Sequence, residues 1–428
     1  MNLTESKDKA EFDIFHTENN LPEGTLVVQS RCSVPNNEKS WSEWFAGYFL
    51  AMLWGLVPFI PIFSVFIVIT YYIPRCGYYT VWRIVKFTTQ PSSDAETRNL
   101  NATTEFPLSA EVTDPVWIAV LWGSLALYLL YAYLDRGAEE CGGYRIRRLR
   151  NLHIWDHLAN HFPSKLILSD ELVKYSMENG KQTDEGNDGV FSGLPADATY
   201  LVGYHPHGLS PIGLFTNFMT EANQFSKVFP ELTPFVTGES NHFCMPLWRD
   251  LALNLGMISV SEKSLIHVLD PHKEENKGNF VVVMVGGIPE MLESHPHHYV
   301  LYMKRRYGFF RLALQTGSSL IPCLTFGELS LVDQPQNEPG SSTRSIQEYF
   351  LKHIGTPVPF PYPCGIGPFP HRVPVYTVVG APIPCERISH PSREQVSQLK
   401  ELYLKKLTDL YQRYRDPLDP EAGELVFV

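Results

Sequence analysis

Two histidines separated by a proline stand in the segment Tyr200–Gly208, which reads Tyr-Leu-Val-Gly-Tyr-His-Pro-His-Gly. His205 and His207 are natural proton carriers, because imidazole titrates closer to neutral pH than other side chains. A residue before proline favours extended backbone, so His205 should continue the strand that the preceding residues predict. Gly208 permits a turn directly afterwards and a close approach of a ligand to the backbone. The segment predicts proton-transfer chemistry at the end of a buried strand.

Two alternative roles of this histidine pair stay open. The rings could be hydrogen-bonded loop residues without a functional role, or they could bind a metal ion. A metal needs further ligands, and the chain offers them only in the second histidine cluster at 295–298, which we interpret as a surface loop. We therefore expect no metal site.

Two glycine-containing motifs follow two further strand-like runs. The first is Gly286–Glu290 (Gly-Gly-Ile-Pro-Glu) and the second is Phe326–Glu328 (Phe-Gly-Glu). The carboxyl ends of parallel strands form the edge where α/β sheets bind ligands, so the three motifs predict one shared pocket. Glu290 could orient an imidazole or accept from a substrate hydroxyl group; a carboxylate at a helix N-terminus is the alternative. Glu328 is a weaker candidate.

A basic cluster occurs in a chain that is acidic as a whole. Lys304, Arg305, Arg306 and Arg311 surround the segment Tyr307–Phe309, while the net charge of the chain is −11. We favour a phosphate-bearing ligand at this cluster over the alternative of a solvated helix start. The negative net charge argues against a nucleic-acid-binding protein, which would carry a basic surface.

The elements that must position these residues alternate between strand and helix patterns. Strands are predicted at 200–204, 280–285, 320–326 and 373–379, and helices at 247–255, 264–269, 309–315 and 392–415. Strands separated by helices favour an α/β domain with a largely parallel sheet. Loops are predicted at 178–195 and 333–345, and an irregular proline-rich stretch at 357–374. Seven cysteines without a Cys-x-x-Cys pair indicate a reducing compartment rather than a disulfide framework.

Two long runs without charge precede this domain, at 45–74 and 115–134. A membrane span needs roughly 20 apolar residues, so both runs are long enough, and tyrosines and arginines flank them. We predict an N-terminal transmembrane hairpin with spans at 45–74 and 115–134 and a lumenal connection at 75–114. Buried core helices are the alternative. The arginines that follow the second run place residues 135–428 on the cytosolic side, and 1–44 is expected to be an acidic, disordered segment.

At these motifs the chain resembles the type-2 diacylglycerol acyltransferase family, which includes monoacylglycerol and wax-alcohol acyltransferases. The resemblance covers about residue 145 to the C-terminus and includes the motif Gly286–Glu290. The further matching positions are Tyr204, His205, Pro206, His207, Gly208, Arg306, Gly308, Phe309, Arg311, Ala313, Gly317, Pro322, Phe326, Gly327, Glu328, Val378, Val379, Gly380, Pro382 and Ile383.

The resemblance implies an enzyme that transfers a fatty acyl group from acyl-CoA to the free hydroxyl of diacylglycerol, forming triacylglycerol. Monoacylglycerol and long-chain alcohols are the alternative acceptors. Acyl-CoA is then a substrate, and no cofactor is expected. Membrane lipids are expected partners, nucleic acid is not, and a homo-oligomer stays open. The expected location is the endoplasmic reticulum membrane, multi-pass, with lipid droplets as a second site and the catalytic domain in the cytosol.

The site residues follow from the same resemblance. His205, His207 and Glu290 are the expected catalytic residues. The expected substrate-binding residues are Gly208, Gly286, Gly287, Arg306, Gly308, Phe309, Arg311 and Glu328. Two functions from different classes remain as alternatives: a non-catalytic lipid-binding membrane protein, and a metal-dependent hydrolase.

Overall fold

The computed structural model describes residues 15–16, 20–31, 115–180, 193–354 and 370–428, together with the single positions 46 and 191. The chain divides into two compact units. One unit combines residues 1–57 with 138–428, and the other contains residues 58–137. Within the described residues, the first unit is built around a nine-stranded sheet with the order β1-β2-β3-β10-β9-β4-β7-β5-β6.

The part of the sheet that carries the three motifs is parallel. It contains β9 (Ser319–Phe326), β4 (Tyr200–His205), β7 (Asn279–Met284), β5 (Thr233–Gly238) and β6 (Met257–Ser259). These strands are rich in β-branched residues and do not alternate with polar ones, as expected of strands covered on both faces. The prediction of an α/β domain with a largely parallel sheet is confirmed.

The opposite end of the sheet mixes directions. β10 (Val375–Val379) is antiparallel to β9, and β3 (Ser164–Leu168) is parallel to β10. β2 (Leu26–Val28) then pairs antiparallel with β3, and β1 (Phe15–His16) pairs antiparallel with β2. The expectation that residues 1–44 are disordered is therefore wrong for these two strands. All three side chains of β2 are buried, so apolar burial orders a segment whose surroundings in the sequence are polar.

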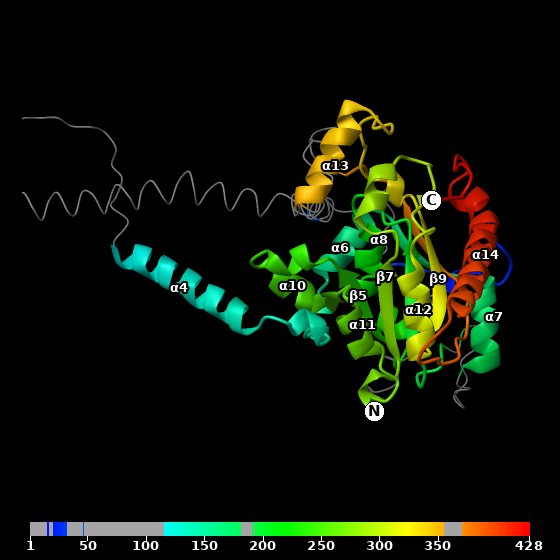
Figure 1. The fold of residues 1–428 in the computed structure, drawn as a ribbon, viewed down its shortest axis with the longest axis horizontal. Coiled ribbons are helices and arrows are strands. Elements are labelled where there is room, and N and C mark those ends of the chain that lie inside the picture. The colour runs from blue at the N-terminus through cyan, green and yellow to red at the C-terminus, as the bar shows by residue number, and fades with distance from the viewer. Residues whose placement is uncertain are drawn as a thin grey trace, which may run out of the picture. The chain divides into compact units, whose positions relative to one another are not determined.

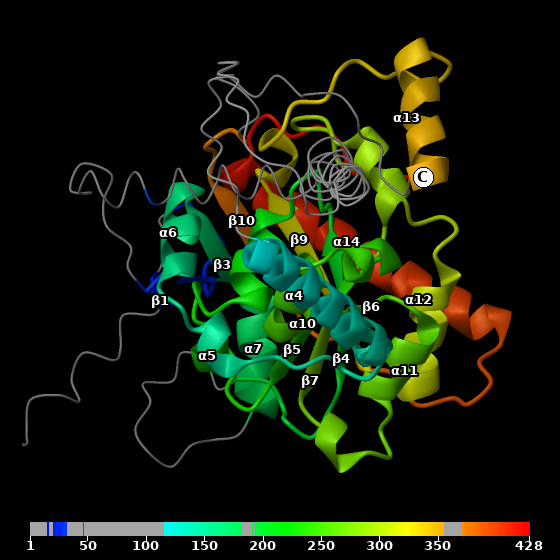
Figure 2. The same ribbon diagram turned by 90° about the vertical axis from the view of Figure 1, so that its left-hand side faces the viewer.

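Helices cover both faces of the sheet (Figure 1 and Figure 2). One face packs against α6 (Ile154–His161), α8 (Ile212–Leu214), the π-helical segment η4 (Phe215–Met219) and α10 (Trp248–Leu255). The other face packs against α11 (Glu262–Leu269), α12 (Tyr307–Thr316) and α14 (Arg393–Leu418). The four helices predicted from the sequence are thus found, and α14 begins with a capping box at Ser392.

The remaining elements are short or peripheral. They are η3 (Ala138–Glu140), α5 (Arg147–Arg150), α7 (Asp170–Asn179), α9 (Phe225–Val228), η5 (Ser240–Cys244), η6 (Glu274–Asn276), η7 (Ile288–Glu293), β8 (Val300–Leu301), η8 (Glu328–Ser330), α13 (Ser342–Ile354) and β11 (Val426–Phe427). α13 was not predicted from the sequence, and its first residues fall in the predicted loop at 333–345. Residues 181–190, 192 and 357–369 of the predicted irregular stretches lie outside the described part.

A buried arginine holds the helices of the α8 face together. One guanidinium nitrogen of Arg150 donates to the carbonyl oxygens of Phe218, Met219 and Leu255 at 2.8–3.0 Å. These carbonyls stand at the C-terminal ends of η4 and α10, where helices leave carbonyl groups without partners. The other terminal nitrogen pairs with Glu221 at 3.3 Å. Burial lowers the pKa of Arg150 despite this pairing.

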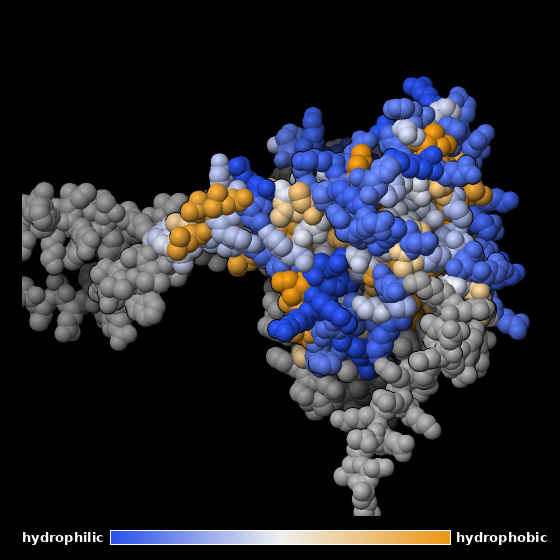
Figure 3. Space-filling model, turned by 90° about the horizontal axis from the view of Figure 1, so that it is seen from below, coloured by the Kyte–Doolittle hydropathy of each residue, from blue (hydrophilic) through white to orange (hydrophobic). Residues whose placement is uncertain are grey.

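The second unit contributes one described helix, α4 (Pro115–Leu134), which has the bounds of the second predicted span. From position 122 onward most of its side chains are exposed, including Leu127 and Leu134 at 69% and 74% (Figure 3). Within the described residues, no helix combines the length and the apolar composition that a membrane span requires. The first predicted span lies, except for position 46, outside the described residues, as does the connection at 75–114.

Candidate active site

The three motifs meet at one edge of the sheet. β4 lies between β9 and β7 and is parallel to both, with His205 beside Leu324 and Tyr204 beside Met284. The segments that follow these strands therefore leave the sheet on the same side. This confirms that His205–Gly208, Gly286–Glu290 and Phe326–Glu328 share an edge of the kind that binds ligands in α/β folds.

The turn after His205 packs directly on the motif Phe326–Glu328. Gly208 has a φ of +59°, and a Cβ placed there would lie 3.0 Å from the carbonyl oxygen of Glu328. The Thr325 hydroxyl donates to the carbonyl oxygen of Pro206 at 2.7 Å. A side chain at position 208 would be strained by the φ angle and by the nearby backbone. Gly208 thus serves the turn itself.

His205 is completely buried, and its ring extends toward the face covered by α14. Its Nε2 lies 3.0 Å from the hydroxyl of Tyr403, a residue of α14. Its Nδ1 has no hydrogen-bond partner among the described residues. Burial, assisted by the neighbouring His207, lowers the pKa of His205 to about 3. The ring is therefore neutral at pH 7 and can accept a proton at a nitrogen.

His207 has a defined tautomer. Its Nε2 lies 3.0 Å from the carbonyl oxygen of Gly287. A carbonyl oxygen can only accept, so Nε2 carries the hydrogen, and in the neutral ring the lone pair is on Nδ1. This bond ties the segment His205–Gly208 to the motif Gly286–Glu290, because Gly287 belongs to the segment that follows β7.

Glu290 completes the group around His207. Burial raises the pKa of its carboxyl group, and the nearby His207 is the strongest influence that lowers it. The backbone N–H of Tyr302 donates to Oε2 at 3.1 Å, whereas Oε1 has no partner in the described part of the chain. The carboxyl group occupies the space where Gly286 would carry a side chain. The motif Gly286–Glu290 therefore makes room for its own glutamate.

Arg306 joins this group as well. Its guanidinium donates to the carbonyl oxygen of Gly286 and contributes to lowering the pKa of Glu290. Phe309 packs on the hydrogen-bond partner of His205: its ring lies against that of Tyr403, with 5.8 Å between the ring centroids. Gly308 faces open space. Arg311, in contrast, is exposed and pairs with Glu262 of α11 at 3.3 Å, so no contact connects it with the histidines.

Glu328 lies apart from the histidine rings. Its carboxylate accepts from the Tyr204 hydroxyl at 2.7 Å and from the N–H of Gly213 at 2.6 Å. Tyr204 and α8 belong to the core on the face opposite Tyr403. Burial raises the pKa of Glu328 to about 8, although these hydrogen bonds oppose the shift. Glu328 thus anchors the start of α8.

Sequence reasoning missed Tyr403, because its helical spacing marks it only as a core position of α14. Gly203 offered a signal, since a glycine inside a strand indicates a close approach of another group. A side chain at Gly203 would collide with the Tyr403 hydroxyl.

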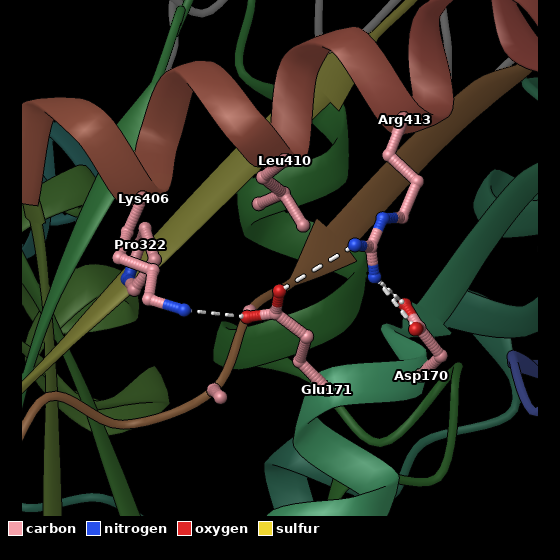
Figure 4. Close-up of a pocket in the computed structure, with 8 residues that line it drawn as sticks. Asp170, Glu171, Pro322, Lys406, Leu410 and Arg413 are labelled. Carbon is pink, nitrogen blue, oxygen red and sulfur yellow. Dashed lines mark hydrogen bonds and ion pairs between the residues drawn. The ribbon is translucent and has the colours of Figure 1, made fainter.

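A surface hollow between α7 and α14 contains none of the predicted site residues (Figure 4). In it Arg413 pairs with Asp170 at 2.6 Å and Lys406 pairs with Glu171 at 3.1 Å. The opposite charges in the hollow pair with each other, and these ion pairs connect α14 to α7.

Similarity to known proteins agrees with the residues at this edge. A model of the family described as diacylglycerol acyltransferase matches residues 191–428. The diacylglycerol O-acyltransferase 2B of Umbelopsis ramanniana is 35% identical, covering 70% of this chain and 80% of that protein. The 2-acylglycerol O-acyltransferase 1 of Mus musculus is 34% identical, covering 72% and 86%. The protein is therefore an acyltransferase. More narrowly, the chain belongs to the diacylglycerol acyltransferase family.

One solved structure is also similar, at a low level. The 1-acyl-sn-glycerophosphate acyltransferase PlsC of Thermotoga maritima is 12% identical, with a TM-score of 0.30 over 69% of this chain and 92% of that chain. A score of this size supports no conclusion about the fold or the chemistry.

Proposed function

We propose that the protein transfers a fatty acyl group from acyl-CoA to the free hydroxyl of diacylglycerol, forming triacylglycerol. The observation that carries the proposal is the buried group of His205, His207 and Glu290 at one sheet edge, in a chain of this family. Monoacylglycerol is the second candidate acceptor, because relatives named for 2-acylglycerol are as similar as those named for diacylglycerol. Long-chain alcohols are a third candidate.

The proposed reaction is a direct attack in a ternary complex. Nδ1 of His205 removes the proton as the hydroxyl oxygen forms a bond to the thioester carbonyl carbon. The carbon–sulfur bond then breaks, and the leaving CoA thiolate takes up the proton from Nδ1 of His205, which returns the ring to its neutral state. A base placed in this way contributes a factor of roughly 10²–10⁴ to the rate. His207 or Glu290 positions the hydroxyl, and a backbone N–H near Gly208 or Gly286 holds the developing oxyanion.

The neutral state of His205 supports this role. A ring with a pKa of about 3 carries a free lone pair throughout the physiological range. The low pKa also makes it a weak base in the closed structure, since a general base works best with a pKa near the working pH. Substrate groups that stabilise the imidazolium must therefore raise the pKa when they bind.

The exclusion of water supports transfer to an alcohol rather than hydrolysis. His205 is 0% and His207 5% exposed, so bulk water does not reach the rings. A closed site protects a reactive thioester from water. It also requires that the acceptor open a path to the ring, and motions of this kind often limit turnover.

We infer that the reaction takes place at a membrane, with the catalytic unit in the cytosol at the endoplasmic reticulum. Moving a chain of roughly sixteen carbons into water costs on the order of 12 kcal/mol, at ~0.8 kcal/mol per methylene. A site beside the bilayer avoids this cost for each substrate. The exposed apolar side chains of α4 are suited to lipid contact. Lipid droplets are a second proposed location.

We assign the acyl-CoA phosphates to the basic cluster around Arg306. Lys304 and Arg305 are exposed beside it, at the start of α12. Arginine binds phosphate through paired hydrogen bonds, and CoA arrives as a polyanion from the cytosol. Because Arg306 also donates to the Gly286 carbonyl oxygen, this assignment brings the CoA end close to the motif Gly286–Glu290.

A product profile tests the acceptor. Membranes from cells that lack neutral-lipid synthesis and express the full chain are incubated with labelled acyl-CoA and each alcohol in turn. Triacylglycerol should be the main product with diacylglycerol. Products formed only from monoacylglycerol or a long-chain alcohol would replace the first candidate by the second or third.

Alanine substitutions test the site. His205→Ala and His207→Ala should each lower turnover by roughly 10²-fold or more, while His297→Ala should leave it near the wild-type value. His297 is a matched control, because its ring bonds to Asp419 in the second histidine cluster. Full activity in both of the first two variants would overturn the mechanism.

A further inference from the structure

We propose that Tyr403 of α14 is a positioning residue that fixes the tautomer and the orientation of the His205 ring. This inference rests on the proposed role of His205 as the base. The two residues lie 198 positions apart in the chain, and their side chains meet on the α14 face of the sheet at 3.0 Å.

The hydroxyl of Tyr403 has two neighbours and one hydrogen. It lies 3.0 Å from Nε2 of His205 and 3.3 Å from the carbonyl oxygen of Gly203. Because a carbonyl can only accept, both contacts are satisfied when the hydroxyl donates to Gly203 and accepts from an N–H at Nε2. Burial raises the pKa of Tyr403, so the hydroxyl keeps its proton.

This arrangement sets the state of the second ring nitrogen. With hydrogen at Nε2, the neutral ring carries its lone pair on Nδ1. That is the atom without a hydrogen-bond partner in the described structure. Buried polar atoms without partners are uncommon in proteins, and a proton acceptor awaiting a substrate hydroxyl accounts for this one. The reverse donation would bury an N–H without an acceptor.

The surroundings hold the hydroxyl in place. Tyr403 is fully buried, and the rings of Phe309 and Phe310 pack on it at 5.8 and 5.4 Å between centroids. Gly203 supplies the space, because a Cβ there would collide with the hydroxyl and lie 2.9 Å from Nε2. A glycine inside a central strand weakens the strand, so the close approach of the hydroxyl explains its presence.

The chemistry differs from that of bases oriented by a carboxylate. An aspartate beside a histidine orients the ring and also stabilises the imidazolium that forms. A neutral hydroxyl orients the ring without adding negative charge. The imidazole of His205 then stays neutral until the substrates supply charge that stabilises the imidazolium. This suits a base that must be unprotonated when the substrates bind.

Substitution by phenylalanine separates orientation from packing. Tyr403→Phe keeps the ring and removes the hydroxyl, and we expect kcat to fall on the order of ten- to hundredfold with little change in either KM. Tyr411→Phe is the matched control. Tyr411 is also a buried residue of α14, and its hydroxyl donates to the Gly423 carbonyl. This control should keep the wild-type kcat and show a similar change in thermal stability.

A double-mutant cycle decides whether Tyr403 acts through His205. In a His205→Ala background, Tyr403→Phe should have no further effect on the residual rate. A further loss of the same size as in the wild-type background would mean that the hydroxyl acts on folding or on another group, and would overturn the proposal. So would a wild-type kcat for Tyr403→Phe. If His205→Ala itself keeps full activity, the proposed function of His205 fails instead, and the two failures remain distinguishable.

Discussion

Glu290 and Glu328 are both buried glutamates in glycine motifs at the same sheet edge, yet their hydrogen bonding differs. Each oxygen of Glu328 accepts a bond, from Tyr204 or from the backbone of Gly213. Glu290 keeps one oxygen without a partner in the described structure, as His205 keeps one ring nitrogen. A satisfied buried carboxyl group holds a structure together. An unsatisfied one beside His207 is available to a substrate.

The same contrast extends to the two faces of the sheet. The α8 face contains Arg150, whose guanidinium holds the ends of two helical segments, and Glu328, which anchors a third. The α14 face contains the His205–Tyr403 pair. We conclude that the buried polar groups on the α8 face serve stability, and that the polar atoms at the edge that have no hydrogen-bond partner in the described structure serve chemistry.

The largest expected effect breaks the α8 face. Arg150→Met should destabilise the protein by about 3–5 kcal/mol, because it leaves Glu221 buried without its partner and three carbonyls without a donor. Chemical denaturation measures the loss. The double variant with Glu221→Gln should recover part of it. A loss below about 1 kcal/mol would show that the face does not depend on this pair.

A second effect concerns activity rather than stability. Glu290→Gln should lower kcat on the order of 10²-fold, while its thermal midpoint stays equal to or above that of the wild type, since the amide avoids a buried charge. Steady-state kinetics with labelled acyl-CoA measures the change. Glu328→Gln is the matched control and should keep most of the activity. The reverse order of the two kcat values would invert the comparison.

The third effect is a change in how stability depends on pH. The folded-state pKa of Glu328, about 8, lies above its ordinary value of 4.5. Its contribution is therefore complete below pH 4.5 and is lost as the pH rises through 8. The difference in unfolding free energy between wild type and Glu328→Gln should fall steadily over this range. A difference that is constant with pH would contradict the assignment.

His205 should act in the opposite direction. Its pKa falls from 6.5 to about 3 in the folded protein. The stability linked to its neutral form is thus complete above pH 6.5 and lost as the pH falls toward 3. Denaturation curves of His205→Gln, measured from pH 6.5 down to about pH 4, should fall less steeply with acid than those of the wild type.

The smallest effect concerns the ion pairs outside the edge. Arg413→Ala should cost about 0.5 kcal/mol and leave kcat unchanged, because the pair with Asp170 is partly exposed and screened by solvent. Thermal unfolding at low and high salt checks this, and the difference from wild type should shrink in salt. A large loss of activity would mean that the hollow between α7 and α14 belongs to the site.

Much of the fold and the edge was predictable from local patterns. Apolar β-branched runs mark the strands β4, β7 and β9, and glycines with polar residues mark where they end. In a parallel sheet these ends share one side, so the meeting of His205, Gly286 and Glu328 follows from the strands alone. The order of the strands was not predictable, because the β2–β3 pair and the β4–β9 pair each join residues more than a hundred positions apart.

The sequence by itself determined which residues stand at the edge, since that depends on short-range backbone preferences. Only the tertiary structure decided what each of them contacts. Alternation along β4 sends Tyr204 to one face and His205 to the opposite face, and a distant helix brings Tyr403 to the ring. Two glutamates in similar motifs acquire different roles, because hydrogen bonds at 2.6–3.1 Å are set by packing between elements rather than by neighbours in the chain.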